Sequence, residues 1–362
     1  MSSPAEHAAA LAALPGAGSA RLGRLLESAV ADEAWAAVLA GRVAAEVAPA
    51  AIREEWRVAA RTVDLGSIRQ QLAAAETVAS SWHDEVHPAQ FVRDIDPAPI
   101  AFRRGRLPDP SLPHVAIVGT RRASAIGREI ARELGAGLAT AGVVVVSGLA
   151  LGIDGAAHQG ALMAGVTPPV AVVGSGCDVP YPRDHRELWS SVAATGAVVS
   201  EAPMGARPEP WRFPARNRLI VAMSDLVVVV ESRAAGGSLL TVDEAVRRGI
   251  DVMAVPGSLR NGAAVGTNLL LADGCAPVLE VGDVTAALGL DVVGQADRRR
   301  DDETASLQGD AALVFSSIDD GPTSVEQVVE RSGVAVADVY AHFARLELAG
   351  AIAYDGARVR RT

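Results

Sequence analysis

Residues 115–149 read VAIVGTRRASAIGREIARELGAGLATAGVVVVSGL, and this stretch decides the fold. Two short valine-rich runs, Val115–Val118 and Val143–Val146, flank a segment at 126–140 whose apolar residues recur at helical spacing. A strand, a helix and a second strand in this order form the unit from which parallel sheets are built. Because both runs are apolar without alternation, we expect their strands to be buried on both faces.

The same alternation continues along the chain to about residue 290. Further strand-like runs lie at Val170–Val173, Val198–Val199, Leu226–Val230 and Val252–Val255. Helical segments between the strands are expected at 153–164, 184–194 and 239–248. We therefore predict an α/β fold with a Rossmann-like, doubly wound, mostly parallel sheet over residues 112–290.

The N-terminal residues 1–82 carry Ala and Leu at helical spacing and predict a helical domain of the SAM or helix-hairpin-helix type. Inside it, LPGAGSARLGRLL at residues 14–26 has Gly16 and Gly18 in a turn and Ser19 as a candidate cap of the next helix. Such a turn either presents N–H groups to a phosphate or merely joins two helices of a bundle. The proline-rich segment 83–111 is expected to be a linker.

The C-terminal part of the chain predicts a second, small domain. Residues 291–310 are polar and charged and are expected to form a flexible linker. Residues 311–362 then indicate helix, turn, helix and a hairpin around Asp355-Gly356, with Ser324 beginning a helix. This order is typical of a winged helix, which binds either DNA or protein.

Composition limits the classes of function. The net charge of -10 argues against a protein that coats nucleic acid with its whole surface, although a local basic groove stays compatible with it. All 33 basic residues are arginines, so every basic phosphate contact would use a planar guanidinium. The two cysteines are far apart without a CxxC, and we expect neither a metal nor a cofactor. Without a basic leader or an apolar run of about 20 residues, a cytoplasmic protein with no membrane partner is expected.

Candidate ligand contacts follow the strands, because doubly wound sheets bind ligands beyond the carboxyl ends of their strands. After the first strand, GTRRAS offers a tight turn, hydroxyls and cations to a phosphate through Gly119, Thr120, Arg121, Arg122 and Ser124. It lacks the second glycine of a GxGxxG motif, so a dinucleotide site is not predicted. Later loops add Ser147, Gly148, Gly152, Arg183, Gly236, Gly237 and Ser238.

The segment from Ala202 to Leu219 has a different character from the other loops. Four arginines alternate there with two aromatic residues: Arg207, Trp211, Arg212, Phe213, Arg216 and Arg218. Cations that follow a phosphate backbone and aromatic faces that stack on bases are what binding to single-stranded nucleic acid requires. We interpret this segment as a single-strand contact.

Taken together, VAIVGTRRAS, VVVVSGLALGIDGAAHQGAL, AVVGSGCDVPYPRDHREL, FPARNRLIVAMSDLVVVVES and GGSLLT resemble the DprA (Smf) family in their order and spacing. The resemblance implies a protein that binds single-stranded DNA and is not an enzyme. It also implies that the protein protects incoming DNA and loads RecA recombinase onto it in natural transformation.

Carried over residue by residue, the resemblance implies phosphate contacts from the Arg121 loop, Arg183, Arg212, Arg216 and Arg218, with Asn217 beside them. Phe213 would meet a base, and Gly236, Gly237 and Ser238 would complete the pocket. A homodimer is implied near Thr267–Cys275, through Leu269, Leu270 and Leu271. Arg122 stands where the family usually has lysine, and His87-Pro88 where it often has Tyr-Pro.

Two other functions remain open from the sequence. GGSLLTVDEA is similar to the glycine-rich motif of phosphoribohydrolases, in which Glu244 and Arg218 would act on a glycosidic bond. Alternatively, the chain is a scaffold whose winged helix alone binds DNA, through Arg331, Arg345, Arg358, Arg360 and Arg361.

Overall fold

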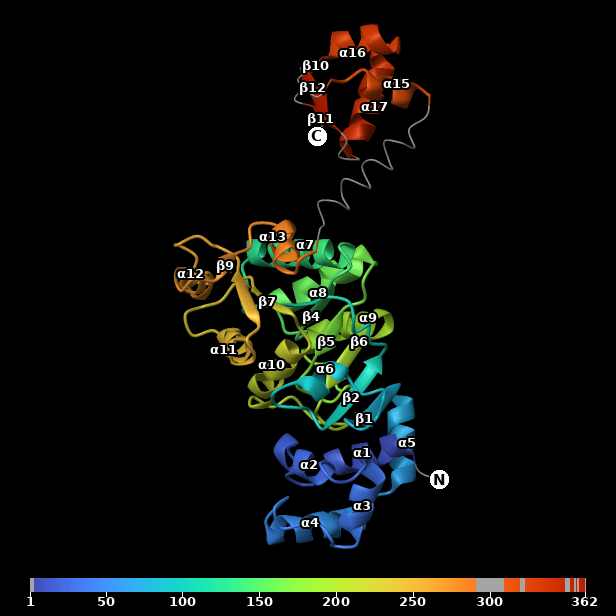
Figure 1. The fold of residues 1–362 in the computed structure, drawn as a ribbon, viewed down its shortest axis with the longest axis vertical. Helices are drawn as coiled ribbons and strands as arrows, with labels where there is room; N and C mark the ends of the chain where they lie inside the picture. The colour runs from blue at the N-terminus through green and yellow to red at the C-terminus, as the bar shows by residue number, and fades with distance from the viewer. Residues whose placement is uncertain are drawn as a thin grey trace. The chain divides into compact units, whose positions relative to one another are not determined.

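A computed structural model describes residues 3–290, 309–319, 323–348, 352–354, 356 and 358–361. The chain divides into two compact units, Met1–Leu288 and Gly289–Thr362 (Figure 1). Each unit is described by itself.

The first unit is built on a nine-stranded sheet with the order β1-β2-β6-β5-β4-β3-β7-β8-β9. From β6 to β9 all neighbours are parallel, whereas β1 and β2 are antiparallel additions at one edge. The predicted doubly wound, mostly parallel sheet is thereby confirmed. The strands are β1 Thr77–Ser81, β2 Ile100–Gly105, β3 His114–Val118, β4 Val144–Ser147, β5 Val170–Val172, β6 Ala197–Ser200, β7 Leu226–Val229, β8 Asp251–Ala254 and β9 Ala276–Pro277.

The central strands are buried along their whole length because helices cover both faces of the sheet (Figure 1). Continuous valine runs suit this position, since neither face of a central strand meets water. The helices of this region are α7 Ala125–Thr140, α8 Ile153–Ala164, α9 Arg186–Thr195, α10 Arg212–Ala222, α11 Leu239–Arg248, α12 Val265–Ala272 and α13 Val281–Ala287.

Helices α7 and α8 approach each other through glycines. A Cβ on Gly135 would lie 2.2 Å from the carbonyl oxygen of Ala157, and a Cβ on Gly160 would lie 1.9 Å from that of Arg132. The two backbones can therefore touch only because both positions lack a side chain.

The segment 83–111 differs from the expected linker. It contains α6 Ala89–Arg93 and strand β2, which pairs with β6 in the register Phe102↔Ser200. Ile100, Ala101 and Phe102 are buried within the sheet. The free energy gained by burying these side chains stabilises the strand despite the prolines on either side of it. Prolines at strand ends and edges are tolerated, so they did not mark a boundary here.

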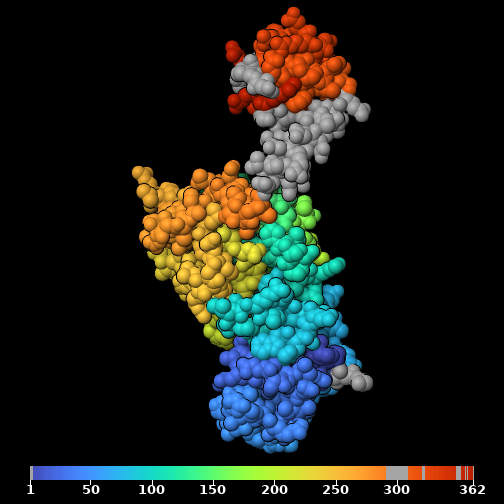
Figure 2. Space-filling view, in the orientation of Figure 1, coloured from blue at the N-terminus to red at the C-terminus, as the bar shows by residue number. Residues whose placement is uncertain are grey.

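The helical region before β1 is part of the first unit. Its helices are α1 Pro4–Ala12, α2 Ser19–Leu26, α3 Ala31–Leu39, α4 Ala50–Ala60 and α5 Leu65–Ala74. Gly18, not Ser19, is the N-cap of α2. The indole Nε1 of Trp56 donates to the Pro15 carbonyl at 2.8 Å, which fixes the turn between α1 and α2. Figure 2 shows this region in blue, packed against the remainder of its unit.

The second unit has the fold of a winged helix, as predicted. Helices α15 Asp310–Ser316, α16 Val325–Ser332 and α17 Val336–Leu348 enclose a core with Val328, Phe343 and Val359. The three-stranded sheet is formed by β10 Thr323–Ser324, β11 Ile352–Tyr354 and β12 Arg358–Arg361. Ser324 caps α16 through its hydroxyl, which accepts from the Gln327 N–H. Residues 291–308 of the expected linker lie outside the described residues.

No helix within the described ranges combines the length and the apolar character that crossing a bilayer requires.

The contact between α7 and α8 gives a test of the packing. Gly160→Ala should destabilise the first unit by about 1–3 kcal/mol, since overpacking against a backbone carbonyl exceeds the gain in helix propensity. Gly23→Ala is the matched control, because its Cβ would lie 3.4 Å from the Trp82 ring at its nearest contact. Urea unfolding followed by circular dichroism measures both variants. Equal midpoints for the two would contradict this account.

Candidate functional site

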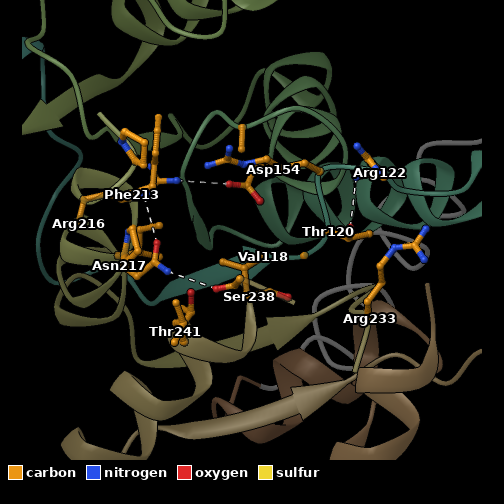
Figure 3. A pocket seen from close by; sticks show the side chains of 18 of the residues that line it. Val118, Thr120, Arg122, Asp154, Phe213, Arg216, Asn217, Arg233, Ser238 and Thr241 are labelled. Carbon is orange, nitrogen blue, oxygen red and sulfur yellow. Dashed lines mark hydrogen bonds and ion pairs between the residues drawn. The ribbon is translucent and has the colours of Figure 1, made fainter. Parts of the chain in front are cut away.

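A cleft of about 610 Å³ opens at the carboxyl edge of the parallel sheet. We call it the first cleft; it is lined by the loop after β3, the start of α10 and the loop that leads into α11. Figure 3 shows Phe213, Arg216 and Asn217 on one side and Thr120, Arg122 and Arg233 on the other. The predicted contacts that line it are Gly119, Thr120, Arg121, Arg122, Phe213, Arg216, Asn217, Gly237 and Ser238.

Two of the predicted glycines hold the loops of this edge together. A Cβ on Gly119 would lie 2.5 Å from the Ile153 side chain. Gly152 has φ +84°, and its Cβ would lie 2.3 Å from the Thr120 carbonyl oxygen. The loop after β4 therefore packs at Gly152 against the backbone of the loop after β3, while Gly119 leaves room for Ile153, and both close contacts require glycine.

The N-terminus of α7 already holds a carboxylate of the protein itself. Glu231 accepts from the Ser124 backbone N–H at 2.8 Å and from the Ser124 hydroxyl at 2.6 Å. The amide of Asn261 donates to the same carboxylate at 2.9 Å. A Cβ on Gly127 would lie 2.4 Å from the Glu231 side chain, so this position must be glycine. Ser124, predicted as a phosphate contact, thus stabilises a helix end instead of lining the cleft.

Arg216 forms the floor of the first cleft as a buried cation. Its guanidinium donates to the carbonyls of Gly148, at 2.8 Å, and of Val172, and it faces the Asp154 carboxylate at 3.9 Å (Figure 3). Burial lowers the pKa of Arg216 to about 10, while the Asp154 charge opposes this shift. Burial also raises the pKa of Asp154, and Arg216 opposes that. Because a Cβ on Gly148 would lie 2.1 Å from the guanidinium, Gly148 is needed for the arginine to fit.

The exposed cations of the first cleft are Arg121, Arg122 and Arg233. The Arg121 guanidinium lies 4.6 Å from the centre of the Phe213 ring, and the Tyr181 ring lies 5.4 Å from that centre. A cation and two aromatic rings are therefore stacked at the wall of the cleft. Gly148 also borders a small adjoining cavity of about 50 Å³ beneath this stack.

The start of α11 contributes backbone as well as side chains. Gly237 has open space beside its Cα, whereas a Cβ on Gly236 would lie 2.4 Å from the Ser232 hydroxyl. The Ser238 hydroxyl donates to the Ser232 hydroxyl at 2.9 Å. Gly236 thus shapes the loop, while Gly237 and Ser238 line the cleft.

Arg218 has a different place from the one expected. It is buried in ion pairs with Glu201 and with Asp96, the latter at 3.4 Å, and it donates to the Asp96 carbonyl at 2.7 Å. A guanidinium Nη also lies 3.4 Å from the Ser19 hydroxyl in the helical region. Its charge is satisfied inside the protein, so it connects the sheet to that region and lies outside the first cleft.

Arg212 lies at a second cleft, of about 560 Å³, between the helical region and the sheet. This second cleft is lined by the turn between α1 and α2, the ends of β5 and β6, and Trp211, Arg212 and Arg218 at the start of α10. The remaining predicted contacts lie outside both clefts. Ser147 is buried and its hydroxyl donates to the Ile117 carbonyl, and Arg183 is exposed on a short 3₁₀ turn at Arg183–His185.

Sequence reasoning missed Tyr181, Asp154 and Arg233 as lining residues. Tyr181 lies in YPRDH, two positions before Arg183, and the charge of Arg183 made it the predicted contact of this loop. Arg233 is the cation of the ESRAAGG loop, and that charge was a usable signal.

The predicted dimer segment, Thr267–Cys275, covers most of α12 and ends just before the edge strand β9 (Figure 1). Leu269 is 51% exposed, while Leu270 and Leu271 are half-buried. Figure 2 shows this orange segment at the surface. Both residues of β9 are exposed, and no further strand among the described residues pairs with this edge of the sheet.

These features define a class: a doubly wound α/β protein with an arginine-lined ligand cleft at the carboxyl edge of its sheet, followed in the chain by a winged helix. The family model of DNA recombination-mediator protein A matches residues 79–289, and that of the DprA winged helix domain matches residues 298–355. The chain belongs to the DNA recombination-mediator protein A (DprA/Smf) family.

Individual relatives agree with this assignment. Protein Smf of Escherichia coli is 36% identical over 275 residues, which cover 74% of this chain and 73% of Smf. The X-ray structure of DNA processing protein A from Streptococcus pneumoniae is similar with a TM-score of 0.64 and 28% identity, over 77% of this chain and 95% of that one. DNA processing protein A from Helicobacter pylori, whose structure was studied for its single-stranded DNA binding mode, has a TM-score of 0.52 and 28% identity, over 58% of this chain and 95% of that one.

The buried side chain of His158 predicts how the free energy of unfolding changes at acidic pH. His158 is fully buried in α8, and burial lowers its pKa to about 3. The unfolded chain, with an ordinary histidine pKa of about 6.5, binds this proton more readily than the folded chain between those values. The free energy of unfolding should therefore fall as the pH drops from about 6.5 toward 3, by up to about 1.4 kcal/mol per unit.

Urea unfolding of the wild type and of His158→Gln, followed from pH 8 to pH 4, measures this effect. The variant should lose less stability on acidification, because the glutamine that replaces His158 does not titrate. If the free energy of unfolding falls equally with pH in both proteins, His158 is not the cause of the loss of stability.

Proposed function

We propose that this protein binds single-stranded DNA in the first cleft and acts as a recombination mediator. The observation that carries the proposal is the stack of Arg121, Phe213 and Tyr181 at the cleft wall. A guanidinium beside aromatic rings offers charge to a phosphate and a flat face to a base at one place. Unpaired bases can reach such a face, whereas bases of a duplex are already stacked and paired.

The remaining cations of the first cleft support the same conclusion. Arg122 and Arg233 are exposed opposite Phe213 and Asn217, so a strand lying in the cleft would meet arginines on both sides (Figure 3). The protein as a whole has a net charge of -10, so a group of exposed arginines in one cleft differs from the average charge of the chain. Single-stranded DNA binding by the Helicobacter pylori relative supports the choice of ligand.

We extend the proposal to the finer roles implied by the family. The protein would protect incoming single-stranded DNA in the cytoplasm and load RecA recombinase onto it during natural transformation. It would act as a homodimer through the α12 surface, where Leu269 is exposed beside the edge strand β9. Binding of this kind needs no chemical step, so the protein would not be an enzyme.

The phosphoribohydrolase alternative finds little support in the geometry. Glu244 pairs with Arg247 and Arg248 on α11, and it is not among the residues that line the first cleft. Arg218, its suggested partner, is buried in other ion pairs. The two residues are therefore not brought together around a ligand.

Binding through the winged helix alone is also less well supported. The exposed residues of α17 include Val336 and Tyr340, and its exposed Arg345 is accompanied by the acidic Asp338 and Glu347. Acidic side chains on the helix that would enter a groove repel phosphates. The first cleft carries no such exposed acid among its lining residues.

The central test is Arg121→Ala. Removing a phosphate contact and the guanidinium beside Phe213 should weaken single-stranded oligonucleotide binding by about tenfold or more. The slope of log affinity against log salt should also shrink, by about 0.7 for each phosphate that the variant no longer neutralises. Fluorescence anisotropy with a salt titration measures both. Arg42→Ala, an exposed arginine of the helical region, is the matched control. Unchanged affinity in the Arg121 variant would refute the proposal.

The dimer is tested by Leu269→Asp, which places a charge on the proposed apolar contact. The variant should be monomeric by size-exclusion chromatography with light scattering, at concentrations where the wild type is dimeric, because an unpaired charge in an interface is costly. Val58→Asp, at a 54% exposed position on α4, controls for the added charge. A monomeric wild type, or a dimeric Leu269 variant, would exclude this surface.

A further inference from the structure

The second cleft lies on the same edge of the sheet as the first. It is formed where β5 and β6 end, at Gly174 and Glu201, whereas the first cleft lies where β3 and β7 end. The strand order β6-β5-β4-β3-β7 makes this edge continuous. Since neighbouring strands lie about 4.8 Å apart, the edge runs roughly 19 Å from β7 to β6. A ligand long enough to cross it would meet both clefts.

The first turn of α10 separates the two clefts and presents an aromatic residue to each. Phe213 lines the first cleft, Trp211 lines the second, and Arg216 borders both. Trp211 and Phe213 are two residues apart, so this turn places one aromatic ring in each cleft.

Trp211 is unlike the other tryptophans of the chain. It is 59% exposed, whereas Trp35, Trp56 and Trp189 are at most 4% exposed and Trp82 is half-buried. The Arg212 guanidinium lies 4.5 Å from the centre of its ring, which covers one face. Because most of the ring is exposed beyond that contact, a second flat group can stack on it.

The walls of the second cleft suit a nucleotide base. The lining of this cleft includes the apolar side chains of Leu14, Leu22 and Leu219, which are almost fully buried, and the exposed ring of Trp211. The acidic groups nearby are engaged within the protein: Glu201 with Arg218, and Glu209 with the indole N–H of Trp211 and with Arg212 at 3.7 Å. Stacking and apolar contact, more than charge, would therefore hold a ligand there.

Resting on the proposed function, we propose that the second cleft binds the nucleotides next to those in the first, with one base stacked on Trp211. The turn between α1 and α2 then faces the strand, so the helical region belongs to the DNA interface. Gly18 is exposed in this turn and caps α2 without a side chain, which leaves that wall open.

The first experiment compares oligothymidylates of about 2 and about 20 nucleotides, because the shorter cannot cross both clefts and the longer exceeds common single-strand site sizes. Trp211→Ala should weaken binding of the longer strand by about 5- to 100-fold, the worth of one base stack, and leave the shorter strand unaffected. The salt dependence should stay that of the wild type, because no phosphate contact is removed. Trp211→Phe should restore part of the affinity.

A matched pair of variants tests the opposite wall. A Cβ at Gly18 would have no neighbour within 4 Å, and both Gly18→Asp and Gly18→Asn supply a helix cap. Only the aspartate places a negative charge beside the strand. Gly18→Asp should therefore weaken binding of the longer strand by roughly threefold or more, while Gly18→Asn keeps wild-type affinity.

The outcomes separate this inference from the proposed function. Selective loss for the longer strand in Trp211→Ala and Gly18→Asp supports the second cleft as part of the path. Wild-type binding of the longer strand by both variants, or equal losses for both lengths, overturns it. If Arg121→Ala still weakens both lengths in that case, the proposed function stands without the second cleft; if it weakens neither, both fail.

Discussion

The buried guanidinium of Arg216 is the interaction on which the site depends. It joins the loop after β4, the end of β5 and the first turn of α8, through the carbonyls of Gly148 and Val172 and the carboxylate of Asp154. A buried cation is tolerated only when partners of this kind surround it. With Arg216 held in place, α10 begins at the carboxyl edge of the sheet, and its first turn divides that edge into two clefts.

A second constraint decides which charges reach a ligand. Two helix ends beside the first cleft carry carboxylates of the protein itself: Glu231 accepts from Ser124 at α7, and Asp154 lies in the first turn of α8. Helix N-termini attract negative charge, and here the fold itself satisfies that attraction. The exposed arginines Arg121, Arg122 and Arg233 are the cations that a phosphate can reach, and the start of α11 adds Gly237 and Ser238 to the lining.

The positions of the central strands along the chain could be anticipated because uninterrupted valine runs suit strands buried on both faces. The predicted runs and the observed β3, β4, β5, β6, β7 and β8 agree within a residue or two. The segment 83–111 was misread, because its prolines masked Ile100–Phe102, whose burial comes from pairing with β6 nearly a hundred residues later. Long-range pairing of this kind leaves no local periodicity.

The sequence alone therefore determined the fold class, the edge of the sheet that carries the site, and the kinds of residue gathered there, because these follow from local apolar patterns and from the loops after each strand. Only the tertiary structure decided which arginine does what. Arg216 and Arg218 are two positions apart in one helix, yet one forms the floor of the first cleft and the other connects the sheet to the helical region. Successive residues of a helix point about 100° apart, so which ones meet solvent depends on what the fold packs against each side.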